Sequence, residues 1–277
     1  MSISVHTNKS ALVALQNLNS TNDKLGETQN KINTGLKIAN ARDNAAIWSI
    51  AQGQRADIGA LAAVKMSLDR ANSISEVSMT AGESVSDLLV QLKEKVVAAM
   101  DTSLDTNSRL ALDSDFKAIL RQIKQVTDNA SFDGANMLNG SIPSDIQFLA
   151  NAEANSYITL SAQDMSLGNL IITIPPTSSL STATLASSVL LQLNASIANV
   201  NQALGNLGSQ AKQIAAHANF VSKLTDVLET GVGNLVDADL AKESARLQAL
   251  QVQQQLGAQA LSIANQAPQI ILSLFKG

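Results

Sequence analysis

The sequence predicts a mainly α-helical protein built from long helices, and three observations support this prediction. Hydrophobic residues make up 45% of the chain but aromatic residues only 3%, so the core must be packed from Ala, Leu, Ile and Val, which suits close-packed helices. Three of the four prolines lie at 143, 175 and 176, and because helices avoid proline, residues 1–142 and 177–267 are free to be helical. Apolar residues recur by threes, fours and sevens through both stretches.

Composition narrows the class of protein further. Charged residues make up 15% of the chain, below the roughly 25% of ordinary soluble domains, which predicts that much of the surface contacts other chains. The net charge is −4 and basic residues are not clustered, so we expect no nucleic-acid partner. Cysteine is absent, which excludes disulfides and thiolate metal sites. The first residues lack the apolar run of a secretory signal, and we expect no membrane span.

The first half of the chain has two helical repeats. Between residues 74 and 96, apolar side chains advance by threes and fours and keep one face. A turn-like stretch at 101–107 follows, and the same spacing returns from Leu112 to Val126. Asp133-Gly134 then ends the helical pattern, because this pair favours a turn.

The segment between the prolines differs in pattern and predicts a small β-hairpin region near 142–174. Asp145–Leu149 and Tyr157–Leu160 flank Asn151–Asn155, which reads as a strand, a turn and a strand. Leu170–Ile174 is a third β-like run before Pro175.

The strongest periodicity follows the prolines. One apolar row repeats every seven residues across five heptads, which indicates a long helix packed against neighbours by knobs into holes. The row consists of Leu193, Val200, Leu207, Ile214, Val221 and Leu228.

Both ends of the chain also carry heptad rows. Near the start, Leu18, Leu25 and Ile32 form one row. Near the finish two rows occur, one of Leu256, Ile263 and Ile270 and one of Leu250, Gly257, Ala264 and Ile271. A C-terminal helix with more than one apolar side cannot be covered by a single partner helix. We therefore expect the two ends to pair and other copies of the chain to cover the remaining side.

Candidate catalytic and metal-binding residues do not form a constellation. His6 and His217 stand apart from each other and from any paired carboxylate. Asp101 and Asp105 only partly match a calcium loop, because the required glycine and terminal glutamate are missing, and helix capping is the favoured interpretation. Asp113 and Asp115 are likewise interpreted as helix caps or first-turn charges. We expect neither an enzyme, a cofactor nor a metal site.

Several motifs resemble those of bacterial flagellin. The N-terminal segment from Thr7 to Leu18 is similar to the family's opening motif, and Lys31–Ile38 with Ala41–Ala46 is similar to its Ser-Gly-Leu-Arg-Ile and Asp-Asp-Ala-Ala stretch. Ser131–Leu138 is similar to its Phe-Asn-Gly turn. Near the C-terminus, Asp237–Glu243 and the run from Ala264 to Leu274 resemble the family most specifically, including Pro268.

The resemblance implies a domain plan and a function. In this family the termini pair as coiled coils that line a tubular filament, which maps here to an inner domain of residues 1–43 and 235–277. An outer helical bundle would comprise 44–234, with a β-hairpin segment at 142–175. The chain has no room for the large hypervariable domains of longer members. It would be a minimal flagellin, a structural subunit that polymerises into the flagellar filament for swimming.

The resemblance also implies partners and a location. We expect a helical homo-polymer outside the cell, exported through the flagellar type III apparatus without a cleaved signal peptide. An export chaperone, the filament cap and the hook–filament junction proteins would be its other partners.

The residues expected at the assembly interface are of two kinds. The apolar ones would bury the seam of the inner layer, and the four polar ones would cap helices or bridge segments. They are Leu12, Leu18, Leu25, Ile32, Leu36, Asp43, Asn44, Asp237, Asp239, Leu256, Ile263, Pro268, Ile270 and Leu274.

Two alternatives share parts of this pattern. A hook–filament junction protein has related termini, but the close C-terminal match and the short central segment favour flagellin. A flagellin with an inserted protease domain would need an insert and a His-Glu-x-x-His motif, and the sequence has neither.

Overall fold

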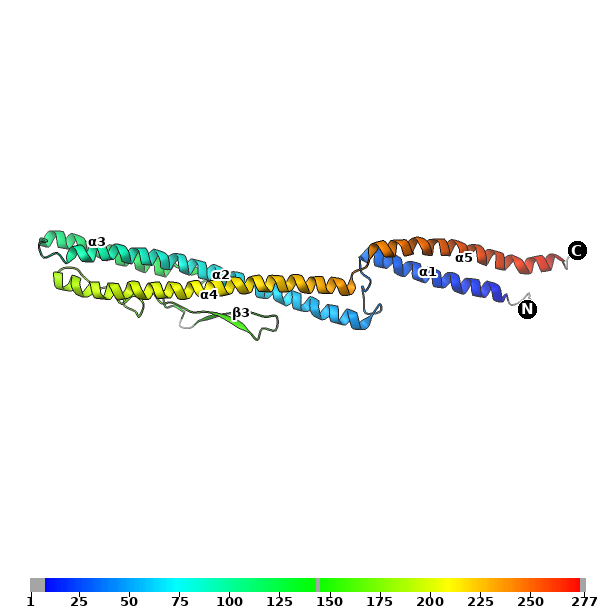
Figure 1. Cartoon of the computed structure of the whole chain (residues 1–277), viewed down its shortest axis with the longest axis horizontal. Helices are drawn as coiled ribbons and strands as arrows, with labels where there is room; N and C mark the ends of the chain where they lie inside the picture. The colour runs from blue at the N-terminus through cyan, green and yellow to red at the C-terminus, as the bar shows by residue number, and fades with distance from the viewer. Residues whose placement is uncertain (1–7, 143–144, 275–277) are drawn as a thin grey trace. The chain divides into compact units, whose positions relative to one another are not determined.

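The structure is a computed structural model that describes residues 8–142 and 145–274, with side chains placed as far as residue 266 in the C-terminal helix. The predicted fold class is confirmed, since helices dominate and the strands are short (Figure 1). The elements in chain order are α1 (Lys9–Thr34), α2 (Ala45–Ala99), α3 (Thr106–Asn129), β1 (Ser131–Phe132), β2 (Ala135–Asn136), β3 (Ile146–Leu149), β4 (Tyr157–Leu160), α4 (Ala183–Val236) and α5 (Leu240–Leu274).

The chain divides into two compact units. We call residues 1–56 with 227–277 the terminal unit and residues 57–226 the central unit. The units part inside the continuous helices α2 and α4, whereas the sequence placed the division at 43–44 and 234–235, near helix ends. The packing units of one chain thus differ in their bounds from the predicted inner and outer domains, which stay a prediction about the assembly.

In the central unit, α3 and α4 lie along α2 and enclose an aliphatic core (Figure 1). The predicted row of α4 is buried from Leu193 to Val221. Helix α4 packs closely against α2 through a side chain beside this row, because a Cβ atom on Gly82 would lie 2.7 Å from Cδ2 of Leu204. Phe116 is the only aromatic among the fully buried side chains of the described residues, as the composition implies.

Capping residues determine where α3 begins. The Asp105 side chain accepts a hydrogen bond from the Ser108 amide at 3.0 Å. Hydrogen bonds from the Ser108 hydroxyl and from this amide hold the pKa of Asp105 below its ordinary value. The Arg109 guanidinium donates to the carbonyls of Ala99 and Asp101, so it satisfies the last turn of α2. The interpretation of Asp105 as a cap is confirmed.

The interpretation of Asp113 and Asp115 as caps or first-turn charges is wrong, because both lie well inside α3. Asp113 is 5% exposed and accepts hydrogen bonds from the Leu180 amide, the Ser179 hydroxyl and the Lys117 ammonium. Burial raises the pKa of Asp113, but these donors together lower it below its ordinary value. Asp113 therefore fastens the segment that precedes α4 onto α3.

Short strands follow α3. β1 and β2 form an antiparallel pair whose turn consists of Asp133 and Gly134, with φ of 49° and 77°. Left-handed backbone at both central residues is the geometry of a type I′ hairpin turn, which Asp-Gly favours. The predicted end of the helical pattern at this pair is confirmed.

The predicted strand–turn–strand is also confirmed. β3 and β4 pair antiparallel, with Ile146 opposite Leu160 and Leu149 opposite Tyr157. The hairpin is attached to two helices, because the Leu149 amide donates to the Ser67 hydroxyl on α2 and the His217 ring on α4 bonds the Ala150 carbonyl at 2.7 Å.

The third predicted strand, Leu170–Ile174, is not a strand. Its alternation correctly marks Ile172 and Ile174 as buried. Its backbone groups find other partners, since the amides of Gly168 and Asn169 both donate to the Ile172 carbonyl and the Thr173 amide donates to the Ser196 hydroxyl on α4. A tight turn and a helix side chain thus replace the neighbouring strand that the pattern implied.

Among the described residues, α4 is the one helix long and apolar enough to cross a membrane, with a mean hydropathy of 1.2 over its most apolar stretch. We expected no such segment from the sequence. The buried positions of α4 follow one face, whereas Asn194, Asn201 and Lys212 are exposed on others. A membrane span needs apolar side chains on all lipid-facing sides, so this pattern is that of a core helix.

Candidate assembly surface

In the terminal unit, α1 and α5 lie side by side and antiparallel (Figure 1). The least exposed positions of each helix advance by alternating threes and fours, which is the spacing of a coiled-coil seam. On α1 they are Ala11, Ala14, Leu18, Thr21, Leu25, Thr28 and Ile32. On α5 they are Leu247, Leu250, Gln254, Gly257, Leu261 and Ala264.

Small residues let the two helices approach closely. A Cβ atom on Gly257 would lie 3.3 Å from Cδ1 of Leu18, so this leucine packs directly against the α5 backbone. Near the end of the pair, the Asn8 side chain caps α1 by accepting from the Ala11 amide and also donates to the Ala264 carbonyl at 2.6 Å. The seam is therefore closed by packing along its length and by a hydrogen bond near the end.

The predicted α1 row lies on this seam, because Leu18, Leu25 and Ile32 are all half-buried. The predicted α5 row does not. Leu256 and Ile263 are 58% and 69% exposed, and we expected them in the seam. α5 carries two apolar rows, and within one chain α1 covers the row that contains Gly257, since a glycine permits the closer approach.

Other apolar side chains of the terminal unit are also uncovered within one chain. Leu12 and Val13 on α1 are 56% and 55% exposed. Val13 did not appear among the expected interface residues, although the unbroken apolar run 11–15 could have indicated a helix without a polar side. Pro268, Ile270 and Leu274 fall within α5, but their side chains lie outside the described residues.

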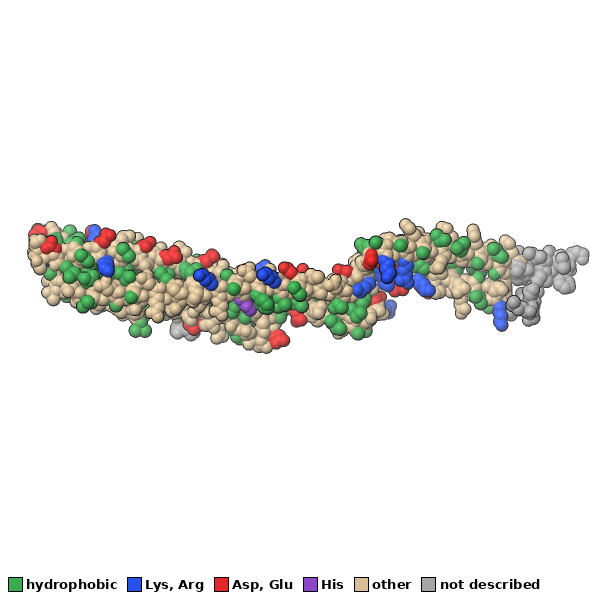
Figure 2. All heavy atoms as spheres, viewed as in Figure 1, with side chains coloured by type: hydrophobic (Ala, Val, Ile, Leu, Met, Phe, Trp, Pro, Cys, Tyr) green, Lys and Arg blue, Asp and Glu red, His purple; other side chains and the backbone are tan. Residues whose placement is uncertain are grey.

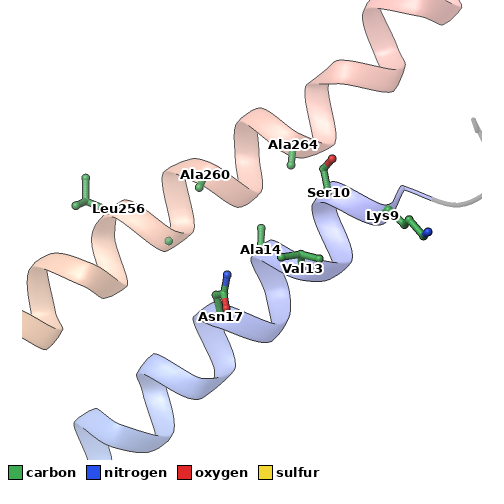
Figure 3. A pocket seen from close by; sticks show the side chains of 9 residues that line it. Lys9, Ser10, Val13, Ala14, Asn17, Leu256, Ala260 and Ala264 are labelled. Atoms are coloured by element: carbon green, nitrogen blue, oxygen red, sulfur yellow. The ribbon is translucent and has the colours of Figure 1, made fainter. Parts of the chain in front are cut away.

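A groove runs along one side of the pair between α1 and α5, with a volume of about 690 Å³ (Figure 3). Val13, Ala14 and Ala260 contribute apolar walls. In Figure 3, Ala14 points toward α5, whereas Leu256 projects away from α1 at the rim. The exposed leucine and valine therefore flank an apolar furrow, which another helix could fill.

The far end of α1 is joined to the connection between α4 and α5. Gly35 ends the helix with φ of 71°, and its carbonyl accepts from the Ala238 amide at 2.8 Å. Leu36 is half-buried and forms an antiparallel bridge with Asp237. The Lys37 amide donates to the Val236 carbonyl at 2.8 Å. Backbone hydrogen bonds thus hold these two segments together.

The remaining polar residues expected at the interface make capping hydrogen bonds. Asp43 accepts from the amides of Ala39 and Asn40 at 2.8 and 3.1 Å. Asn44 accepts from the Ile47 amide at the start of α2, and Asp239 accepts from the Lys242 amide at the start of α5. Each of these residues shapes a helix start or a turn of the terminal unit.

Charge is distributed unevenly over the pair. On the face in Figure 2, Lys and Arg side chains gather where α5 begins, while the rest of the pair shows mostly uncharged and hydrophobic side chains. In the described part of the chain, His, Asp and Glu side chains form no group of three that could hold a metal ion. The chemistry that this surface offers is apolar contact between helices.

Comparison with known proteins places the chain in a family. Residues 5–142 match the bacterial flagellin N-terminal helical region, and residues 190–275 match the bacterial flagellin C-terminal helical region. Flagellin FljJ of Caulobacter vibrioides is 57% identical over the whole of both chains. The chain belongs to the flagellin family. It is a structural subunit of the bacterial flagellar filament, which lies outside the cell.

Further relatives agree with this assignment. Flagellin FljM of the same organism is 48% identical over 99% of this chain and 98% of its own, and the flagellin of Brucella melitensis is 40% identical over 99% of each. Because these relatives match this flagellin from end to end, its short length is shared with them and the predicted minimal form is confirmed.

Solved structures share the fold at low identity. The crystal structure of Bacillus cereus flagellin matches with a TM-score of 0.50 at 18% identity, over 56% of this chain and 88% of that one. A putative flagellar hook-associated protein from Vibrio parahaemolyticus matches with a TM-score of 0.56 at 13% identity, over 70% of this chain and 100% of that one. At these identities the two solved structures show a shared fold and do not separate flagellin from a junction protein. The flagellin relatives that match over the full length favour flagellin.

Proposed function

We propose that the α1–α5 pair forms the inner layer of the filament and that copies of the chain bury its uncovered apolar side chains against one another. The inner layer would comprise residues 1–43 and 235–277, and residues 44–234 would form the outer layer. The expected interface residues, including Leu12, Leu256 and Ile263, would meet equivalent helices of neighbouring copies.

The exposure of these side chains carries the proposal. Leu12, Val13, Leu256 and Ile263 are each more than half exposed on a helix pair that is already closed on its other side. Burying one such side chain completely contributes about 1.5–3 kcal/mol. The four side chains are 55–69% exposed, so burying what remains contributes on the order of 4–7 kcal/mol per copy. This gain is at the lower end of the cost of losing translational and rotational freedom on association.

Seeded assembly of purified subunits tests the proposal. Leu256→Gln and Ile263→Gln place a polar side chain on the outer row without touching the seam with α1, so the subunit should fold and filament growth should slow at least tenfold. Met66→Gln is a matched control, because Met66 lies in the central unit and is 68% exposed against 69% for Ile263. Growth of both outer-row variants at the wild-type rate would refute the proposed role.

A truncation addresses the C-terminal end directly. A subunit that lacks residues 265–277 loses the last part of α5 and with it Pro268, Ile270 and Leu274. We expect this form to add to filament seeds far more slowly than the full chain. Elongation at the full rate would show that the end is dispensable.

Export and delivery form a second part of the proposal. An export chaperone would cover the apolar C-terminal helix before export through the type III apparatus, and the cap and junction proteins would meet the subunit afterwards. An uncovered apolar surface of this kind favours premature association, which gives such a chaperone its physical purpose. Mass spectrometry of the N-terminal peptide from sheared filaments tests the export route, since removal of a leader segment would contradict it.

A further inference from the structure

The central unit presents one hydrophobic side chain almost completely to solvent. Leu170 is 87% exposed, more than any other large hydrophobic side chain in the described part of the chain. A single exposed leucine is common on protein surfaces and carries no meaning alone. The backbone around Leu170 gives this one its significance.

The turn that carries Leu170 is fixed by hydrogen bonds on both sides. The amides of Gly168 and Asn169 donate to the Ile172 carbonyl at 2.9 and 3.0 Å. The Asn199 side chain on α4 donates to the Leu170 carbonyl at 3.1 Å. Because folding has already ordered this backbone, binding through Leu170 would lose little further conformational entropy.

A groove on the same unit is open in the described part of the chain. It lies between α2 and α3 and has a volume of about 700 Å³. Its apolar lining includes Val77 and Ala81 from α2, Val126 from α3 and Ala130 at the C-terminal cap of α3. Glu76 is the one charged residue among those that line it.

Next to this groove, the surface of α2 at Gly82 is covered by two side chains of the same copy. A Cβ atom on Gly82 would lie 3.5 Å from the terminal methyl of Met165 and 2.7 Å from Leu204 of α4. Met165 belongs to the same loop as Leu170. The loop thus packs a flexible apolar side chain against α2 at Gly82, while the groove beside Ala81 and α3 stays open.

Leu170 and the open groove agree in their height along the helical bundle and in the small number of charged residues around them. Asn199, which holds the turn, lies five residues before Leu204, or about 7.5 Å along α4 at 1.5 Å per residue. Leu170 and the groove therefore sit at similar heights on the bundle. Asp164 is the one charged residue between 161 and 182, so contact between the loop and the groove would bring few charges out of water.

We propose that Leu170 of one copy inserts into the α2–α3 groove of the adjacent copy in the filament. The two surfaces differ, so the contact is heterologous and can continue from copy to copy around a tube. This contact requires that the chain form filaments, but it does not depend on the inner-layer role proposed for α1 and α5.

Cysteine cross-linking tests the contact, because the natural chain has no cysteine that could interfere. Leu170→Cys and Val126→Cys subunits are mixed, assembled and oxidised. We expect disulfide-linked dimers that contain one of each variant, and a ladder of higher oligomers from the double variant. Each variant assembled alone should give no dimer, because the contact joins two different surfaces.

Leu191→Cys replaces Leu170→Cys in the control, because Leu191 is also strongly exposed, at 72%, but lies on helix α4 and not on the turn that carries Leu170. Equal dimer yields from the two mixtures, or normal filaments without the Leu170–Val126 link, would overturn the proposal. Leu170→Ser provides a second readout without cysteine. Its filaments should depolymerise at a lower temperature than those of wild type and of Leu191→Ser, and an unchanged temperature would also overturn the contact.

Failure of the inner-layer proposal gives a different result. In that case Leu256→Gln and Ile263→Gln subunits would grow normally, and the Leu170–Val126 link could still form in their filaments. The two proposals are therefore tested by separate measurements.

Discussion

Asn8 and Ala264, separated by 256 residues, are joined by a hydrogen bond of 2.6 Å from the Asn8 side chain to the Ala264 carbonyl. The same side chain accepts from the Ala11 amide and so caps α1. One asparagine thus starts the N-terminal helix and fastens it to the C-terminal helix. Sequence alone identifies Asn8 as part of a flagellin motif, and the structure supplies a physical reason for an asparagine there.

Asn8→Ala should loosen the beginning of α1 by about 1–2 kcal/mol, because it removes the cap and the bond to α5 together. Amide hydrogen exchange of residues 9–14 in assembled filaments should speed up by roughly 5–30-fold. Asn19→Ala on the exposed side of α1 is the control and should leave these amides unchanged. Equal exchange in wild type and Asn8→Ala would contradict the role of this side chain.

The carboxylate of Asp113 should make the central unit sensitive to acid. Its pKa is lower in the folded chain than its ordinary value, so the carboxylate stabilises the fold above about pH 4, and this stabilisation is lost as the pH falls through the folded pKa. Asp113→Asn leaves buried donors poorly satisfied and should cost about 1–3 kcal/mol at pH 7. Thermal unfolding followed by circular dichroism measures the loss.

The difference between wild type and Asp113→Asn should shrink as the pH falls below about 4, where the unfolded chain takes up a proton first, and should vanish below the lowered pKa of the folded carboxyl. Asp115→Asn is the matched control. Asp115 also pairs with a lysine, at 2.8 Å, but its side chain is 57% exposed, so its loss should cost less than 1 kcal/mol. A difference between wild type and Asp113→Asn that stayed constant down to pH 2.5 would disprove the electrostatic account.

The regular features of this fold could be predicted from the sequence because each depends on local pattern. The seven-residue row from Leu193 to Val221 is buried as predicted, and the two β-like runs on either side of Asn151–Asn155 pair as predicted. Leu170–Ile174 has the same alternation but no partner strand. Alternation of apolar and polar residues indicates which side chains are buried. It does not indicate which groups hydrogen-bond to the backbone amides and carbonyls.

The candidate surface shows a related limit. α5 carries two apolar rows, and periodicity alone does not decide which of them α1 covers. We expected the row of Leu256 and Ile263 in the seam, and this row is the more hydrophobic of the two. Gly257 and Ala264 decide the outcome, since close approach of two helices depends on small side chains at the crossing as well as on hydrophobicity.

Gly257→Val should separate α1 from α5. The new Cβ atom alone would lie 3.3 Å from Leu18, and two further methyl groups would overpack the seam at a cost of about 1–3 kcal/mol. Filaments of this variant should depolymerise at a lower temperature than wild-type filaments, as followed by light scattering. Gly26→Val on α1 is the control, because nothing lies within 4 Å of a Cβ atom there. Equal temperatures for the two variants would show that Gly257 is not under packing constraint.

The last turn of α2 depends on a side chain from the following helix. Arg109 is 8% exposed, and its guanidinium donates to the carbonyls of Ala99 and Asp101. Arg109→Ala removes both donors and leaves the buried Ala99 carbonyl without this partner, which should cost about 1–3 kcal/mol. For a unit of this size each kcal/mol corresponds to roughly 2–4 °C, so the melting temperature should fall by about 2–12 °C.

Arg109→Lys distinguishes hydrogen bonding from charge. An ammonium keeps the positive charge near the helix end but cannot reproduce the planar fork that reaches two carbonyls, so the loss should lie between those of wild type and Arg109→Ala. Arg121→Ala, an exposed arginine on the same helix, should change the melting temperature by less than 2 °C. If Arg109→Lys melted at the wild-type temperature, the helix dipole alone would account for the arginine, and the two carbonyl bonds would contribute little.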